Sequence, residues 1–395
     1  MNTREVVIVD GCRTAFGKLG GALKDVSAAE LGGICVKALL ERTKIAERGG
    51  QVDSVFAGMA ARDNLARNTA RYISQLAGLP FETAAAFIEM QCGSAINALN
   101  HAAWKILAGM SDIAVVGGVE SHSNKPIAFG TDTVPYRQSI VPLRLHGAPL
   151  PEHDTSMIQN SDKMAAKWEI SREACDEYAL RSQMRLQAAY KSGLIGAEII
   201  PVETPGGTVS KDEHPRPDVT MEKIAAMKPV LAGGVTTAAN SSGLNDGAAF
   251  LLVMTAEKAK ELGYVPYAKW IGGAHAGVRA DYMGVAASYS HLKASKKLGL
   301  KVRDFDVVES NEAFAAQQLT VIKDIQETTG ETVDQSKWNP NGGAIAIGHP
   351  NAASGARITI FAMKQLEKTG GRYASISSCC GGGQGATAII ENLRR

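Results

Sequence analysis

The amino-acid sequence predicts an α/β fold made of two similar halves, with a long segment inserted between them. Three observations support this prediction. Strand-like and helix-like stretches alternate, two distant segments share one order of elements, and the middle of the chain is rich in proline. Strands that alternate with helices are typical of α/β proteins with largely parallel sheets. The chain has 395 residues, more than one hydrophobic core usually holds, so we expect two or three packed units.

Short apolar runs mark the expected strands, and glycines gather at the ends of these runs. Longer helix-like stretches lie between them. The strands are expected at Val6–Val9, Ile113–Val116, Phe250–Met254, Val307–Val308 and Ala374–Ser377, and two of the helices at Ala95–Ala108 and Ala356–Lys368.

Two segments indicate an internal duplication. Residues 92–120 and residues 354–383 both run as small residues, a helix, a glycine break, a strand and a glycine-rich turn. If the two halves face each other, their active loops meet at one interface. The alternative is that any two αβ units look alike.

The middle of the chain differs from both halves because it holds most of the prolines. A helix pair is expected there at about 161–168 and 171–192, and Ser171 is a good helix start. Insertions of this kind usually cover or bind a ligand. We therefore divide the chain into a first half at 1–120, to which 243–267 return, an inserted domain at 121–242, and a second half at 268–395.

Composition excludes several classes of protein. Lys plus Arg is 42 and Asp plus Glu is 40, which gives no reason to expect a nucleic-acid partner. The apolar run Val6–Val9 is too short for a signal sequence, and no stretch approaches the roughly 20 apolar residues of a membrane span. Six scattered cysteines without a CxxC or HxxxH pair suggest free thiols rather than disulfides or a zinc site. We expect a cytoplasmic protein without a membrane span or a bound metal.

Cys92 is the first candidate for chemistry. It lies in Glu89–Ala95, directly before the helix expected at Ala95–Ala108. A helix N-terminus favours the thiolate and lowers the pKa of a thiol, while Gly93 allows a substrate to approach closely. The alternative, from the residues alone, is a buried and inert cysteine.

Three more clusters carry possible catalytic groups. His349, in Asn339–Pro350, lies among residues too small to bury it, so its imidazole could take a thiol proton, although a structural histidine would fit equally. Cys379 begins a glycine-rich turn whose N–H groups suit an oxyanion, although the pattern alone also fits a tight turn. Asn311, which follows a strand, could orient a water or a carbonyl group.

Together these clusters resemble the signatures of the thiolase family, and the resemblance runs from residue 4 to residue 391. The family has an acylated Cys before Gly-Ser, then NEAF, then GGAIALGHP, then CxGGG. The matching segments are Cys92–Ser94, Asn311–Phe314, Gly342–Pro350 with Ile347 in place of Leu, and Cys379–Gly383. Asn245–Ala249 and Ala353–Arg357 resemble further signatures of the family.

The resemblance implies a thiolase-like duplicated αβαβα layered fold and an acyltransferase that makes or cleaves β-ketoacyl-CoA. Cys92 would carry the acyl group in ping-pong kinetics, His349 would take the thiol proton, and Cys379 would transfer the proton at C2. One oxyanion hole would combine His349 with a water held by Asn311. The other would use the N–H groups of Cys92 and Gly381. No cofactor is implied, because coenzyme A thioesters are substrates.

The resemblance also implies ligand contacts and an oligomer. The inserted domain would bind acyl-CoA and free CoA, and the chain would form a homodimer or homotetramer. The family's coenzyme A contacts map onto Arg216, Ala238 and Ser242, and its acyl-pocket contacts onto Met157, Met283 and Phe314. For Met157 and Met283 the alternative is ordinary core packing.

Several positions depart from the pattern of well-known short-chain thiolases. Ser156–Ile158 replaces His-Met-Gly, Glu120–Ser123 replaces Glu-Ser-Met-Ser, and His349–Ser354 replaces His-Pro-Ile-Gly-Ala-Ser. Lys223 stands where a Ser usually contacts coenzyme A. These changes keep the catalytic residues but leave the acyl substrate open, and they allow an unusual or polar acyl group.

Three other functions were weighed. A β-ketoacyl synthase-like condensing enzyme shares the duplicated fold, but its catalytic partners are typically two His, or His and Asn, and the second cysteine in CxGGG argues against it. A non-catalytic acyl-CoA or lipid-binding homologue is disfavoured because all four catalytic positions are filled. A redox protein using Cys379 and Cys380 is disfavoured because bridged adjacent cysteines form a strained ring.

Overall fold

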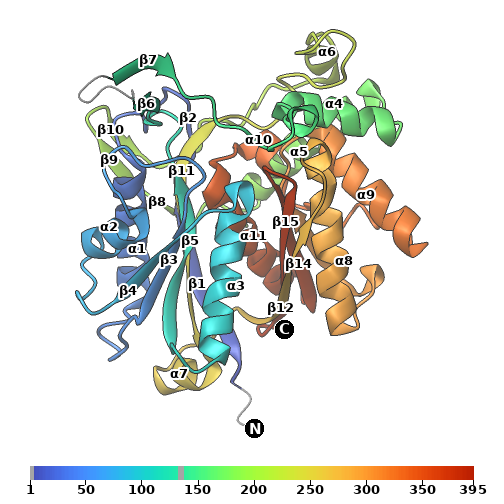
Figure 1. Cartoon of the computed structure of the whole chain (residues 1–395). Helices are drawn as coiled ribbons and strands as arrows, with labels where there is room; N and C mark the ends of the chain where they lie inside the picture. The colour runs from blue at the N-terminus through green and yellow to red at the C-terminus, as the bar shows by residue number, and fades with distance from the viewer. Residues whose placement is uncertain (1–3, 132–137) are drawn as a thin grey trace.

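The computed structural model describes residues 4–131 and 138–395 and shows five stacked layers of helices and strands (Figure 1). Outer helices cover both faces, and two central helices lie between two parts of a sheet. The outer helices are α1 (Ala28–Thr43) and α2 (Thr69–Leu76) on one side and α8 (Ala286–Leu298) and α9 (Ala315–Thr329) on the other, and the central ones are α3 (Ser94–Leu107) and α11 (Ser354–Thr369). The predicted duplicated, layered α/β fold is confirmed.

Eleven strands form one continuous sheet that runs through both halves. Its main path runs through β13 (Val307–Ser310), β14 (Tyr373–Cys380), β15 (Gln384–Asn392), β12 (Ala268–Gly277), β1 (Val6–Thr14), β11 (Asn245–Thr255), β5 (Ile113–Glu120), β3 (Ser54–Gly58) and β4 (Ala84–Ile88). The short strand β2 (Gly17–Lys18) pairs with β11, and β8 (Ile199–Ile200) pairs with β1. The two parts join where β1 pairs with β12, from Val6 opposite Trp270 to Ile8 opposite Ala268.

The expectation of largely parallel sheets is wrong. The pairs β1–β11, β11–β5, β12–β15 and β14–β15 are antiparallel, whereas β3 runs parallel to β4 and β5, and β13 runs parallel to β14. The turn Gly381–Gly383 joins β14 to β15 and is far too short for the crossover that parallel neighbours need. The strand β11 also returns to the first half after the insertion and lies between β1 and β5.

The expected strands and helices are present, and most extend beyond the predicted ends. The strand expected at Val6–Val9 continues to Thr14 in β1. Ser171 caps α5 (Arg172–Lys191) by accepting a hydrogen bond from the N–H of Ala174, as its sequence predicted. The helix α4 (Met157–Lys167) begins earlier than expected, because Ser156 and Gln159 form a capping box.

The inserted segment consists of the helices α4 and α5 and several short elements that pack over the two halves (Figure 1). The helix α5 packs on α9 and on α10 (Ala344–Ile347), and so connects the segment to the second half. The short elements of the segment include β6 (Phe129–Thr131), β7 (Gln138–Pro142), β9 (Val202–Thr204), β10 (Gly207–Val209) and α6 (Met221–Ala225), whereas α7 (Ala256–Glu261) follows β11 in the first half. The division at residues 120, 242 and 268 stays a prediction.

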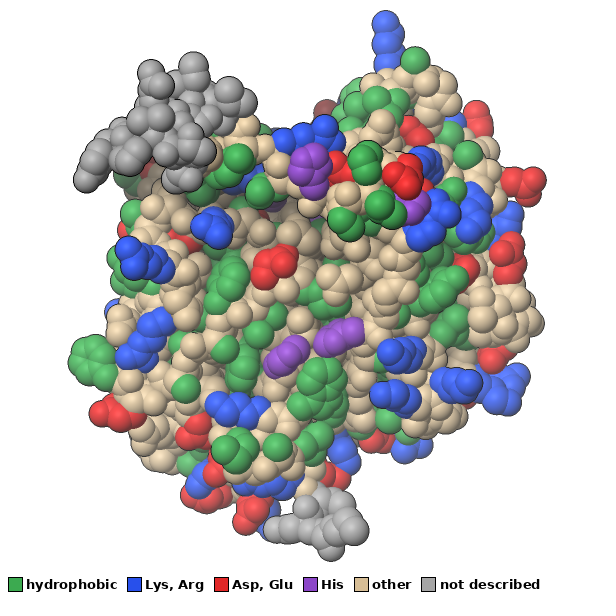
Figure 2. Space-filling view, viewed as in Figure 1, with side chains coloured by type: hydrophobic (Ala, Val, Ile, Leu, Met, Phe, Trp, Pro, Cys, Tyr) green, Lys and Arg blue, Asp and Glu red, His purple; other side chains and the backbone are tan. Residues whose placement is uncertain are grey.

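Charges of both signs are mixed over the face of the molecule seen in Figure 2. That mixture agrees with the near-neutral composition of the chain. None of the helices among the described residues is long and apolar enough to cross a membrane.

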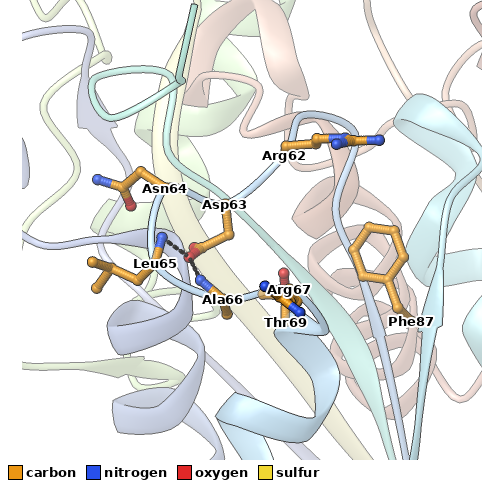
Figure 3. A pocket seen from close by; sticks show the side chains of 8 residues that line it. All are labelled: Arg62, Asp63, Asn64, Leu65, Ala66, Arg67, Thr69 and Phe87. Atoms are coloured by element: carbon orange, nitrogen blue, oxygen red, sulfur yellow. Dashed lines mark hydrogen bonds between the residues drawn. The ribbon is translucent and has the colours of Figure 1, made fainter. Parts of the chain in front are cut away.

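A surface pocket of about 620 Å³ lies over the loop between β3 and α2 (Figure 3). Asp63 shapes this loop, because its carboxylate accepts hydrogen bonds from the N–H groups of Leu65 and Ala66 at 2.7 and 2.8 Å. Arg62 and Phe87 lie on one side of the pocket. None of the candidate catalytic residues lines it, so its size alone does not mark the active site.

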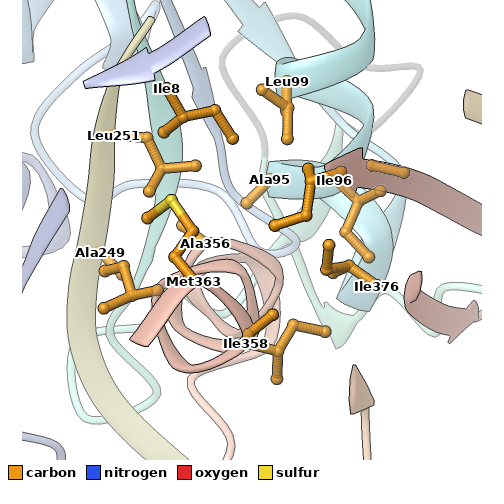
Figure 4. Packing of buried hydrophobic residues seen from close by; sticks show 14 of the residues in the cluster. Ile8, Ala95, Ile96, Leu99, Ala249, Leu251, Ala356, Ile358, Met363 and Ile376 are labelled. Atoms are coloured by element: carbon orange, nitrogen blue, oxygen red, sulfur yellow. The ribbon is translucent and has the colours of Figure 1, made fainter. Parts of the chain in front are cut away.

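The central helices hold the two halves together. Ile96 and Leu99 of α3 pack with Ile358 of α11, Leu251 of β11 and Ile376 of β14, and all five are at most 1% exposed (Figure 4). Fully burying such a side chain stabilises the fold by about 1.5–3 kcal/mol. The turns η1 (Gln91–Gly93) and η5 (Asn351–Ala353), which precede α3 and α11, touch each other. The fold therefore brings the N-termini of both central helices to one place.

Candidate active site

Cys92 lies in the turn η1, directly before α3. Gln91 adopts a left-handed backbone with φ of 47°, which turns the chain sharply at the cysteine. The hydroxyl of Ser94 holds this turn, accepting from the N–H of Met90 at 2.9 Å and donating to the carbonyl of Gln91 at 2.7 Å. The thiol is thus presented at a fixed point rather than on a flexible loop.

His349 lies between α10 and η5 and faces Cys92. Its Nε2 atom is 3.1 Å from the Sγ atom of Cys92, and its Nδ1 atom is 2.6 Å from the hydroxyl of Ser354. The backbone N–H of His349 donates to Asn245 at 2.9 Å, and the side chain of Asn245 donates to the carbonyl of Gly17 at 2.8 Å. The imidazole is therefore held from three directions, with one nitrogen directed at the thiol.

Asn311 follows β13 and reaches the same histidine. Its Nδ2 atom lies 3.3 Å from Nε2 of His349, and its backbone carbonyl accepts from Gln318 at 2.6 Å. The Oδ1 atom of Asn311 is buried and has no hydrogen-bond partner among the described residues. Buried polar atoms are normally hydrogen-bonded, so we expect an additional polar group in the site to bond to this amide oxygen.

Cys379 and Cys380 end β14, and both are buried. The next turn brings Gly381 against Gln91, because a Cβ atom at Gly381 would lie 3.1 Å from Cγ of Gln91. Cys380 packs under the other side of the turn, since a Cβ atom at Gly93 would lie 2.4 Å from Sγ of Cys380. The second-half loop therefore meets the loop that carries Cys92.

Burial changes the acid–base state of the site. Burial raises the pKa of the Cys92 thiol, and Cys379 and Glu120 raise it further. Burial also raises the pKa of Cys379 to about 12 and lowers that of His349 to about 3. The expectation that the helix N-terminus lowers the pKa of Cys92 is therefore wrong, because loss of water outweighs the helix dipole. The resting pair is a neutral thiol beside a neutral imidazole.

Ser354 and the Glu120 carboxylate have no role predicted from the sequence. Glu120 is fully buried, and it accepts hydrogen bonds from the N–H groups of Ala60 and Ala61 at 3.0 Å and of Ala352 at 3.3 Å. It therefore ties η5 to the loop after β3. The signal in the sequence was that both residues lie in segments compared with family signatures, Glu120–Ser123 and Ala353–Arg357.

Two departures from the resembled family contact each other in the structure. Nε2 of His122 lies 3.3 Å from Oδ1 of Asn351. A charged His122 would lower the pKa of both Glu120 and His349, so the pair lies within electrostatic reach of the site. The sequence alone could not join these two positions, because 229 residues separate them.

The residues expected at coenzyme A lie close to one another. Arg216 lines a pocket of about 340 Å³ together with Lys223 and the neighbour of Ala238, Ala239. Arg216 also lines a second pocket of about 400 Å³ with Lys18 and His214. The backbone N–H of Ser242 donates to the carbonyl of Ala313 at 2.9 Å, so this loop lies beside the Asn311 segment.

The residues expected at the acyl pocket have different environments. Met283 is 2% exposed and belongs to the core of the second half, whereas Met157 begins α4 and is 42% exposed. Phe314 is partly buried, and the strand-like contact of its backbone with Ser241 places it beside the Ser242 loop. No group of three or more metal-ligating side chains occurs among the residues that the structure describes.

Comparisons with known proteins agree with this geometry. Residues 6–257 match the family described as thiolase, N-terminal domain, and residues 264–392 match thiolase, C-terminal domain. A beta-ketoadipyl-CoA thiolase of Pseudomonas putida is 39% identical, and an acetyl-CoA acetyltransferase of Syntrophomonas wolfei is 38% identical. Each alignment covers 99% of this chain and 100% of the relative.

Solved structures give the same result. The crystal structure of the Bacillus anthracis acetyl-CoA acetyltransferase is 35% identical, has a TM-score of 0.91, and covers 99% of both chains. Human mitochondrial 3-ketoacyl-CoA thiolase in complex with CoA is 35% identical with a TM-score of 0.89, and the match covers 99% of this chain and 98% of that one.

Proposed function

The chain belongs to the thiolase family and is an acyltransferase that acts on CoA thioesters, and we propose that Cys92 carries the acyl group between two substrates. The observation that carries the proposal is the 3.1 Å distance between Nε2 of His349 and Sγ of Cys92. This is hydrogen-bonding distance between a thiol and a base. Cys379 and Gly381 reach the same place from the other half of the molecule.

In the first half-reaction His349 takes the proton of Cys92. The thiolate sulfur attacks the thioester carbonyl, or the β-keto carbonyl in the cleavage direction. The bond from that carbon to coenzyme A sulfur, or to C2, then breaks. The neutral imidazole suits this step, because a histidine that already held a proton could not accept another. With its proton on Nδ1, the neutral ring would donate to Ser354 and direct the lone pair of Nε2 at the thiol.

Cys379 transfers the proton at C2, in the second half-reaction of synthesis and in the first half-reaction of cleavage. In synthesis the departing coenzyme A sulfur takes the proton of the Cys379 thiol, and the resulting thiolate removes a proton from C2 of a second acyl-CoA. The carbanion attacks the acyl-Cys92 thioester, and the released Cys92 sulfur takes back the proton that His349 holds. In cleavage the thiol of Cys379 protonates the leaving acyl-CoA carbanion, and its thiolate then takes the proton of the incoming coenzyme A thiol. General acid–base catalysis of this kind contributes about 10²–10⁴-fold. The burial that raises the pKa of Cys379 also makes its thiolate a stronger base.

Two groups of donors would stabilise the oxyanions. The Nδ2 group of Asn311 and the ring of His349 lie 3.3 Å apart on one side, and the backbone N–H groups of Cys92 and Gly381 are the candidates on the other. The unpartnered Oδ1 atom of Asn311 supports a water held between the amide and the substrate. Removing one such donor costs on the order of 3 kcal/mol in the transition state.

The cations near the inserted segment support binding of coenzyme A there. Arg216 and Lys223 line one pocket, and phosphate groups favour such paired cations. Lys223 replaces the serine of the family and bonds to the carbonyl of Asp218 at 2.7 Å, so it remains close to the pocket wall. Ala238, Ser242, Met157, Met283 and Phe314 are proposed contacts of the same ligand.

The test is acyl transfer from a radiolabelled acyl-CoA. Wild-type protein should acquire label that is released by free CoA, and Cys92→Ser should acquire none. The matched control is Cys175→Ser, which changes a buried cysteine of α5 outside the site and should be labelled like the wild type. Labelling of Cys92→Ser at the wild-type rate would overturn the assignment.

We also propose that the protein is cytoplasmic and that it forms a homodimer or homotetramer. The fold leaves β4 as an edge of the sheet, and a second copy could pair with this edge. Sedimentation at micromolar concentration would show a dimer or larger species. A monomer throughout that range would contradict the proposal.

A further inference from the structure

A second cluster of charged side chains lies in the segment between β7 and α4. The carboxylate of Asp154, 11% exposed, accepts from Nδ1 of His146 at 2.6 Å, from Nη2 of Arg144 at 3.1 Å and from the N–H of Gly147 at 2.9 Å. Together with Ala148, Pro149 and Pro151 these side chains line a pocket of about 390 Å³. Side chains of histidine and of Lys or Arg, with acidic side chains beside them, lie around a hollow at the top of the face seen in Figure 2.

This cluster lies against the catalytic loop of the second half. A Cβ atom at Gly382 would be 3.6 Å from the carbonyl oxygen of Gly147, the neighbour of His146. Gly382 is three residues from Cys379 and one from Gly381. The pocket shares no lining residue with the two pockets that contain Arg216. It is therefore separate from the pockets in which the nucleotide is proposed to bind.

Further cations surround Asp281 of the neighbouring turn η3 (Ala280–Val285), which also carries Met283. Asp281 accepts from Arg279 at 2.8 Å and from Lys163 at 3.2 Å, and His153 approaches it to 3.6 Å. Its pKa is lowered to about 2, first by the hydrogen bond from Arg279, so it remains charged.

The cations exceed the carboxylates that they contact. Arg144, Lys163 and Arg279 carry three positive charges against the two carboxylates of Asp154 and Asp281, before either histidine gains a proton. Glu152 lies on the turn η2 (Pro151–His153), two residues before Asp154, but it is exposed and forms no ion pair with any described residue. Solvent screens such an exposed charge strongly.

We propose that Arg144 and His146 bind the terminal carboxylate of a dicarboxylic acyl group while its thioester reacts at Cys92. Among the described residues Arg144 bonds only to Asp154 and uses one of its five N–H donors, so it can hold a second carboxylate. His146 uses Nδ1 for Asp154, which leaves Nε2 for the ligand. A methyl-ended acyl chain would gain nothing from these groups and would have to displace their water. The proposal rests on the thiolase activity proposed above and names its substrate class.

The test compares two substrates of equal chain length, 3-oxoadipyl-CoA and 3-oxohexanoyl-CoA, which end in a carboxylate and a methyl group. Wild-type protein should cleave the first with the higher kcat/KM. Arg144→Gln should lower kcat/KM for 3-oxoadipyl-CoA by about tenfold or more, mainly through KM, because a charge-assisted hydrogen bond is lost. The same variant should leave kcat/KM for 3-oxohexanoyl-CoA within about twofold of the wild-type value. His146→Gln should act in the same direction, and Arg144→Lys should keep part of the preference.

The matched control is Arg303→Gln. Arg303 is also exposed and has a single carboxylate partner, Glu331 at 3.9 Å, but it lies away from the site. The Arg303→Gln variant should leave kcat/KM unchanged for both substrates. Equal cleavage of both substrates by the wild type, or an equal loss on both in Arg144→Gln, would overturn the carboxylate subsite and leave the thiolase activity intact. If neither substrate were cleaved and Cys92 took no acyl label, the proposed function would fail, and the subsite with it.

Discussion

The hydroxyl of Ser354 lies 2.6 Å from Nδ1 of His349, on the other side of the imidazole from the thiol of Cys92. Ser354 is also the first residue of α11, so its position is fixed by a buried central helix. A hydrogen bond at Nδ1 decides which tautomer the ring adopts. The serine therefore orients the base without touching the reacting atoms.

We predict that Ser354→Ala lowers the rate of Cys92 acylation by about tenfold, a typical effect of losing an orienting partner of a functional histidine. The imidazole would then lose its tautomer preference while the thiol and the fold remain. The measurement is single-turnover labelling by an acyl-CoA. As a control, Ser295→Ala removes another buried hydroxyl that bonds to a helix carbonyl, that of His291 at 2.8 Å, and should leave acylation unchanged. An equal rate in Ser354→Ala and wild type would exclude the orienting role.

Cys379→Ala should separate the two half-reactions. Cys92 and His349 remain in contact in this variant, so acylation should stay within about threefold of the wild type. Carbon–carbon bond formation should fall by about 10²-fold or more, because the base at C2 is lost. Labelling measures the first step, and condensation of two acetyl-CoA molecules measures the second. Equal losses in both steps would show that Cys379 is not the C2 base.

The residues of the proposed site, Cys92, Asn311, His349 and Cys379, could be named from the sequence because each lies in a segment that ends a strand or begins a helix. Glycines near Cys92, His349 and Cys379 make three of these segments easy to recognise. The direction of strand pairing left no comparable signal. An apolar run shows that a strand is buried, but its neighbours are decided by contacts between distant parts of the chain, as when β11 enters between β1 and β5.

The acid–base state of Cys92 was missed for a related reason. Its place before a helix can be read locally and favours a thiolate. The burial that raises its pKa comes from the second half of the molecule, through residues such as Cys379. The contact between His122 and Asn351 is equally invisible in sequence, since it joins the ends of two segments from different halves.

Acid should destabilise the protein through its buried neutral histidines. Burial lowers the pKa of His291 to about 4, whereas an unfolded histidine has a pKa of about 6.5. Below pH 6.5 the unfolded chain binds a proton that the folded chain does not, so stability falls as the pH falls from about 6.5 to about 4. For one such residue the loss approaches about 3 kcal/mol.

Urea unfolding at several pH values measures this loss. His291→Gln should show a smaller decrease in the free energy of unfolding between pH 6.5 and pH 4 than the wild type, even if it is less stable overall. The exposed His101→Gln is the control and should follow the wild-type curve. Parallel curves for His291→Gln and wild type would show that this ring does not contribute.

The final prediction concerns the two departures that meet in the structure, His122 and Asn351. When His349 takes the proton of Cys92 it becomes positive. Burial is the main cause of the lowered pKa of His349, and a charged His122 nearby lowers it further, so this charge opposes the proton transfer. Histidine changes charge near neutral pH, so acylation in the wild type should slow as the pH falls toward about 5.5.

The variant His122→Met with Asn351→Ile restores the residues of well-known short-chain thiolases and removes this charge. Between pH 8 and about pH 5.5, the acylation rate of this variant should fall about three- to tenfold less than the acylation rate of the wild type. The readout is the pH profile of single-turnover labelling. Identical profile shapes in the two proteins would show that the pair does not influence His349.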